Sequence, residues 1–128
     1  MKPPFKTYGL SHIALAVRDV KRSVEFYERV FGTVTMYLQD GFAQVQTPGT
    51  NDIIVFEENK KLAGKINGGI MHFGFRMVDP GDIDKVLETV SYAGGKIKES
   101  GEFVPGEPYV FFYDPDGYEI EVWYEKSE

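Results

Sequence analysis

Hydrophobic and polar residues alternate along two short stretches of the chain, and apolar residues recur at helical spacing just after each one. The first stretch runs from His12 to Asp19 and the second from His72 to Asp79. The helical spacing appears at Val20, Val24, Tyr27 and Phe31 in one half, and at Ile83, Val86, Leu87 and Val90 in the other. Each half is therefore predicted to form a strand and then a helix, with the aspartate as N-cap and Gly32 or Gly94 as the stop.

The second part of each half also matches. FAQVQTPGTNDIIVFEE, residues 42–58, aligns without a gap with YVFFYDPDGYEIEVWYE, residues 109–125. We therefore expect two copies of a strand, helix and three-strand unit, an α+β fold whose curled mixed sheet carries helices on its convex side. One domain, residues 1–128, would hold modules at about 8–58 and 70–126, joined by a linker at 59–69.

The only two histidines of the chain open the two matching strands. If Ile13 and Phe73 face the helices, alternation turns His12 and His72 into the cavity. The same argument on the last strand turns Glu121 inward. We expect these two imidazoles and one carboxylate to converge.

Such a set fits a divalent metal ion, because two histidines and a carboxylate leave coordination positions open for substrate. Zn, Ni, Mn and Fe all remain possible. Ala14 and Gly74, beside the histidines, leave room for the metal and a ligand. The gapless alignment puts Ile54 opposite Glu121, so the first module offers no fourth ligand. Histidines that simply pack in the core are the competing interpretation.

Other polar and aromatic residues are expected on the same side of the sheet. Arg76 is a candidate either for an ion pair across the cavity or for holding an anionic substrate group, and Phe111 and Trp123 are candidates for the pocket wall. Tyr113 and Glu121 are the candidates for proton transfer. Glu119 follows a turn and is expected to be solvated.

Composition narrows the function classes. The chain has 128 residues, a net charge of −6 and no cysteine. The acidic balance disfavours nucleic acid and anionic membranes, and the lack of cysteine rules out disulfides and thiol nucleophiles. No apolar run long enough to span a membrane and no secretion leader are visible, which leads us to expect a cytoplasmic protein.

Three motifs resemble the vicinal oxygen chelate superfamily, which includes glyoxalases, bleomycin resistance proteins and extradiol dioxygenases. They are SHIALAVRDVKRSVEFYERVFG at residues 11–32, MHFGF at 71–75 and FFYDPDGYEIEV at 111–122. The resemblance implies paired βαβββ modules around a metal cavity, with His12, His72 and Glu121 as ligands. It also implies a homodimer, often with His12 of one subunit beside His72 and Glu121 of the other. Glyoxalase I differs by a fourth ligand, a glutamate where Ile54 stands here.

We therefore expect a glyoxalase-like, metal-dependent lyase, isomerase or addition enzyme that acts on a small molecule with two neighbouring oxygens. A metal-free small-molecule binding or resistance protein of the bleomycin-resistance type is the main alternative. An Fe(II) extradiol-type dioxygenase and an adapter domain with packed histidines are further alternatives.

Overall fold

The computed structural model describes residues 3–65 and 69–126. The first half contains β1 (Ile13–Val17), α1 (Val20–Phe31), β2 (Val34–Gln39), β3 (Phe42–Gln46) and β4 (Ile54–Glu58). The second contains β5 (Phe73–Arg76), a 3-10 turn (Pro80–Asp82), α2 (Ile83–Ala93), β6 (Lys96–Glu102), β7 (Pro108–Tyr113) and β8 (Glu119–Trp123). The repeated order of strand, helix and three strands confirms the α+β prediction. No helix in these described ranges is long and apolar enough to cross a membrane.

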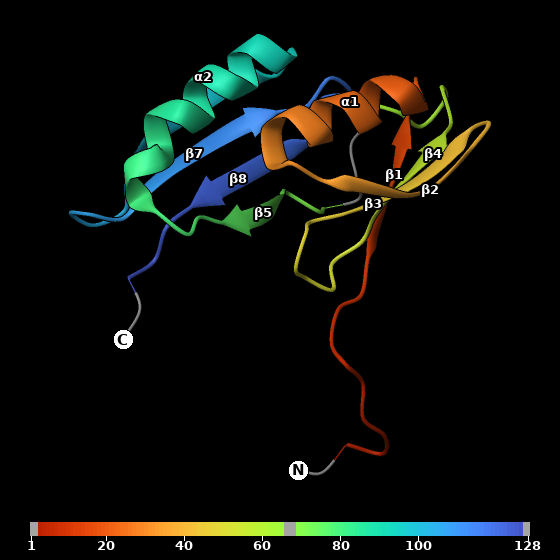
Figure 1. The fold of residues 1–128 in the computed structure, drawn as a ribbon, viewed down its shortest axis with the longest axis horizontal. Coiled ribbons are helices and arrows are strands. Elements are labelled where there is room, and N and C mark those ends of the chain that lie inside the picture. The colour runs from red at the N-terminus through yellow and green to blue at the C-terminus, as the bar shows by residue number, and fades with distance from the viewer. Residues whose placement is uncertain (1–2, 66–68, 127–128) are drawn as a thin grey trace.

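The strands form two four-stranded mixed sheets, one in each βαβββ module, as the repeat predicted. Their orders are β1-β4-β3-β2 and β5-β8-β7-β6. β1 pairs in parallel with β4, and β5 pairs in parallel with β8. All other neighbouring strands pair in antiparallel fashion. Both helices lie on the same side of the molecule, α1 over β3 and β4 and α2 over β6 and β7 (Figure 1). The sheets are not closed on each other.

The helix ends follow the sequence signals, with one exception. The Asp19 side chain accepts a hydrogen bond from the backbone amide of Arg22, and Gly32 ends α1 with a φ of 67°. Gly94 ends α2 in the same left-handed region, which glycine adopts without strain. Asp79 caps the 3-10 turn and not α2, because the Pro80 turn intervenes before the helix begins.

One core joins the two modules. Aromatic side chains of α1 pack against both sheets: Tyr27 lies 5.0 Å from Phe56 between ring centres, and Phe26 lies 6.3 Å from Phe112. Phe31 stacks on Phe75 of the second module at 3.8 Å. The helical spacing in the sequence therefore placed Tyr27 and Phe31 in the core correctly but missed Phe26.

The gapless alignment of the second halves is wrong by one residue. Ile54 pairs with Val45 on β3, and the equivalent pair in the second module is Ile120 with Phe112. The turn between β3 and β4 is thus one residue longer than its counterpart between β7 and β8. Val55, and not Ile54, occupies the position equivalent to Glu121.

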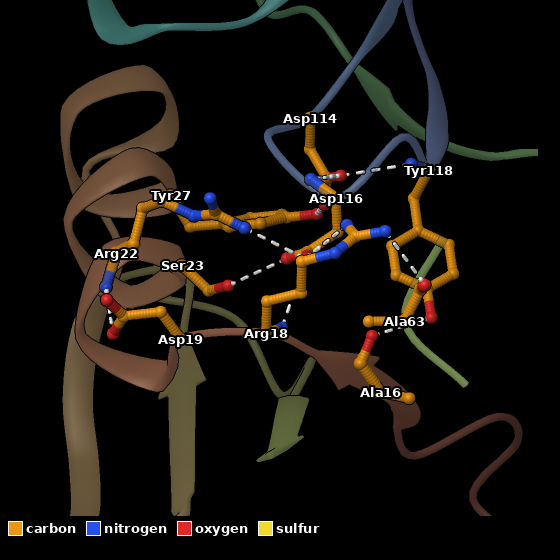
Figure 2. Close-up of polar contacts among 10 residues, drawn as sticks. All are labelled: Ala16, Arg18, Asp19, Arg22, Ser23, Tyr27, Ala63, Asp114, Asp116 and Tyr118. Carbon is orange, nitrogen blue, oxygen red and sulfur yellow. Dashed lines mark hydrogen bonds and ion pairs between the residues drawn. The ribbon is translucent and has the colours of Figure 1, made fainter. Parts of the chain in front are cut away.

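A buried polar cluster fastens the turn before β8 to the first module (Figure 2). The Asp116 carboxylate is fully buried and accepts hydrogen bonds from the side chains of Arg18 at 3.1 Å and Arg22 at 2.9 Å. It also accepts a bond from the Arg18 backbone amide at 3.0 Å. The two guanidinium groups stay partly exposed, so the ion pairs keep some solvation of their cations.

Asp114 completes this cluster from the same turn. It accepts hydrogen bonds from the Tyr27 hydroxyl at 2.7 Å and from the backbone amides of Asp116 and Tyr118. Burial raises the pKa of the Asp114 carboxyl above its ordinary value, although these hydrogen bonds lower it. The Tyr118 hydroxyl donates to the Ala16 carbonyl at 2.7 Å, so the turn also contacts β1. The start of β8 is therefore fixed relative to the first module.

The Asp116→Asn substitution is expected to lower the free energy of unfolding by about 2 kcal/mol, because it weakens a buried charge-assisted network. Asp82→Asn is the matched control: Asp82 forms an exposed pair with Lys85 at 3.4 Å and makes no side-chain cap. Its loss should stay below about 0.5 kcal/mol. Urea denaturation measures both free energies of unfolding. Equal losses in the two variants would contradict the conclusion that Asp116 holds the turn before β8 against the first module.

Candidate metal centre

The second sheet has one face covered by α2 and another, here called the open face, that points away from the helices (Figure 1). Ile120 and Val122 of β8 are buried in the core, so alternation turns Glu121 and Trp123 to the open face, as the sequence predicted. The same alternation places Tyr109, Phe111 and Tyr113 of β7 there, together with His72, Gly74 and Arg76.

His72 and Glu121 lie side by side on the open face. The His72 Nε2 atom is 3.6 Å from Glu121 Oε1, and the side chains are 36% and 15% exposed. The His72 ring also meets Phe111 edge-on, with 5.1 Å between ring centres. A nitrogen and a carboxylate oxygen at this separation, with both side chains partly exposed, can bind a common metal ion after small rotations.

Gly74 provides the space that Glu121 occupies. The two residues are direct neighbours in the parallel pairing of β5 and β8. A Cβ atom on Gly74 would lie 3.1 Å from the Glu121 carbonyl oxygen and 3.7 Å from Oε1. The absence of a side chain at Gly74 therefore accommodates Glu121 itself, whereas the sequence argument assigned this space to a metal and a ligand.

His12 lies apart from this pair in the single chain. It is exposed, immediately precedes β1, and forms a hydrogen bond of 2.7 Å between Nδ1 and the Ser11 hydroxyl. It borders a cavity of about 190 Å³ between the two sheets that Gly74 also lines. Within residues 3–65 and 69–126, however, no three His, Asp or Glu side chains are close enough to hold a metal. The predicted convergence is therefore absent from one chain.

Glu119 is not a solvated residue, contrary to the sequence expectation. Its side chain is 17% exposed and bonds to Lys98 Nζ at 2.9 Å. The hydrogen bond to Glu119 is the main cause that raises the pKa of the Lys98 ammonium above its ordinary value. Sequence reasoning missed Lys98, which sits at an irregularity in the pairing of β6 with β7.

The remaining candidates flank the pair at different distances. Phe111 is in register with Glu121, and Tyr113 with Glu119, so both border the site. Arg76 is in register with Trp123, one row further along β5 and β8. Its guanidinium donates to the Glu125 carbonyl at 3.0 Å and lies 5.9 Å from the Trp123 ring centre.

Comparison with known protein families identifies the superfamily of this chain. The model of the Glyoxalase/Bleomycin resistance protein/Dioxygenase superfamily matches residues 9–122. The chain belongs to this superfamily. The match spans both modules and confirms the resemblance inferred from the three sequence motifs.

Similar proteins within the superfamily are enzymes or resistance proteins. Glyoxylase I 4 of Arabidopsis thaliana is 28% identical, over 93% of this chain and 72% of that protein. Fosfomycin resistance protein FosX of Mesorhizobium japonicum is 29% identical, over 89% of this chain and 84% of that protein. FosX of Listeria monocytogenes, in complex with Mn(II) and sulfate, shares the fold with a TM-score of 0.78 and 22% identity, over 94% and 93% of the two chains.

The donor set of this superfamily member suits a divalent ion. Imidazole and carboxylate together bind Zn, Ni, Mn and Fe, and none of these ions needs a thiolate, which the chain lacks. The position equivalent to Glu121 in the first module is Val55, which is buried and apolar. The first module therefore supplies no carboxylate at this position, and the fourth ligand of glyoxalase I has no counterpart here.

Replacing Gly74 by valine is expected to displace the Glu121 carboxylate and to weaken metal binding on the order of ten-fold. Gly101→Val is the matched control, since its Cβ would crowd the Tyr109 side chain at 3.2 Å in the same sheet. Titration with Co(II), followed by its absorption bands, measures both variants. Equal Co(II) affinities for the two variants would show that Gly74 does not contribute to metal binding.

Proposed function

We propose that this chain is a metal-dependent enzyme that acts on a small molecule with two neighbouring oxygens. His12, His72 and Glu121 would be the metal ligands. The observation that carries the proposal is the pairing of His72 with Glu121 at 3.6 Å on the open face, with Gly74 beside them. The relation to glyoxalases and to fosfomycin resistance proteins agrees with it.

The third ligand would come from a second copy of the chain. β1 and β5 each have a ladder partner on one side only within the described sheets, so each offers an open edge. Apolar residues just before both histidines are exposed, including Leu10 at 96% and Met71 at 79%. A two-fold dimer would cover these residues and bring His12 of the partner subunit to His72 and Glu121.

The chemistry follows from the residues around the pair. A bound divalent ion would act as a Lewis acid and polarise a substrate oxygen. Glu121 offers a carboxylate, and Tyr113 a hydroxyl, for moving a proton to or from the substrate. Both histidines would serve as neutral ligands, and the chain has no cysteine, so covalent thiol catalysis is excluded. This set favours lyase, isomerase or addition reactions.

A metal-free protein that binds or sequesters a small molecule is the second candidate function. The observation in its favour is that no three potential ligands converge within the described residues of one chain. An Fe(II) extradiol-type dioxygenase is a further candidate, because the same three ligands suit ferrous iron.

Reconstitution of the apoprotein with Zn, Ni, Mn or Fe(II) tests these candidates. We expect binding of one ion per chain, and activity on an α-ketoaldehyde thiol adduct or an epoxide with at least one redox-inert ion. His72→Ala should lose on the order of a hundred-fold in metal affinity, because one of three ligands is removed. Equal affinity for a small molecule with and without each metal would favour the metal-free binding protein. Activity on catechols only with Fe(II) and dioxygen would favour the dioxygenase.

A further inference from the structure

The N-terminal arm, defined here as residues 3–11, extends away from the body of the molecule. It forms no helix or strand, and each of its residues is exposed. Three of them are large and apolar: Phe5 is 71% exposed, and Tyr8 and Leu10 are almost fully exposed. In Figure 1 the arm leaves the body on the side opposite the helices, which is the side of the open face. This concentration of exposed apolar side chains marks the arm as an interaction segment.

A row of aromatic rings on the open face leads from the pair of His72 and Glu121, here called the metal pair, to the turn between β6 and β7. This aromatic row consists of Phe111, Tyr109 and Phe103. The distances between ring centres are 5.1 Å from His72 to Phe111, 5.6 Å from Phe111 to Tyr109 and 4.1 Å from Tyr109 to Phe103. At the far end Phe103 and its neighbour Val104 are 54% and 50% exposed. The row therefore offers an apolar strip that begins at the metal pair.

The charges of the arm and of the turn at the end of the row are opposite in sign. Residues 1–11 contain two lysines and no acid, although the net charge of the chain is −6. The turn carries Glu102 and Glu107, whose carboxylates accept hydrogen bonds from backbone amides. Lys126 lies close to Gly106 of this turn, yet among the described residues no ion pair joins it to either carboxylate. The turn can therefore attract a basic segment.

Building on the proposed function, on which this inference rests, we propose that the arm of each subunit lies along the aromatic row of its partner and covers the partner's metal pair. His12 directly follows the arm, and the proposed function brings it to that metal pair, where the row begins. The seven residues from His12 back to Phe5 span about 23 Å when extended, which exceeds the length of the row. Phe5 can therefore contact Phe103 of the partner subunit. In the single chain the arm stays exposed, so its own row does not bind it.

Disulfide trapping tests the contact directly, because the parent chain has no cysteine. Chains carrying Pro4→Cys, next to Phe5, are unfolded and refolded together with chains carrying Val104→Cys and are then oxidised with diamide. We expect a mixed disulfide between residues 4 and 104, identified by mass spectrometry, which can form only between two chains. Tyr92→Cys, at a site on α2 that is 87% exposed, replaces Val104→Cys in the control and should give several-fold less mixed disulfide.

Sedimentation measures how much the arm contributes to the dimer. Phe5→Ser with Tyr8→Ser should raise the dissociation constant of the dimer on the order of a hundred-fold, because two large apolar side chains lose their buried surface. Val78→Ser with Tyr92→Ser is the matched control, since it removes two exposed apolar residues outside the arm and should leave the constant unchanged. Lys6→Glu should weaken the dimer about three-fold, and adding Glu102→Lys should restore the affinity.

Titration of the parent with Zn separates the arm contact from the proposed function. The mixed disulfide in a dimer that binds no Zn would sustain the arm contact and refute the metal enzyme. Tight Zn binding without mixed disulfide above the control would overturn the arm contact alone, as would an unchanged dissociation constant for Phe5→Ser with Tyr8→Ser. A parent chain that stays monomeric would overturn both the arm contact and the shared metal site.

Discussion

The parallel pairing of β5 with β8 is the constraint on which the candidate site depends. It joins the first and last strands of the second module, so residues far apart in the sequence become neighbours: Gly74 lies beside Glu121, and His72 falls within 3.6 Å of it. The turn before β8 is held by Asp116, whose buried carboxylate bonds to Arg18 and Arg22. The first module therefore fixes where β8 begins, and with it the position of Glu121.

The two modules share a topology but differ in chemistry. β1 and β4 pair in parallel as β5 and β8 do, yet Val55 stands where the second module has Glu121. One module thus contributes a histidine alone, and the other a histidine and a carboxylate. Because the sheets of one chain do not close, the proposed ligand set would become complete where the first module of one chain met the second module of another. A two-fold axis would form two such sites.

Periodicity predicted the helices, their glycine stops, the repeat and the orientation of Glu121. It failed at the register of the repeat, because residues 53–56 are all apolar and give no alternation that fixes which face each one takes. The Lys98 pairing depends on a strand irregularity that has no clear sequence signal. The burial of Asp116 has no local sequence signal, since its partner Arg18 is 98 positions away in the sequence.

Mixing two inactive variants tests most directly whether the metal site is shared between chains. His12→Ala and Glu121→Ala each remove one ligand from every site, so neither alone should bind metal tightly. After the chains are unfolded together and refolded, the account predicts recovery of about a quarter of the parent's metal sites, since half of the dimers are mixed and each holds one intact site. No recovery, in a mixture shown to contain mixed dimers, would contradict a shared site.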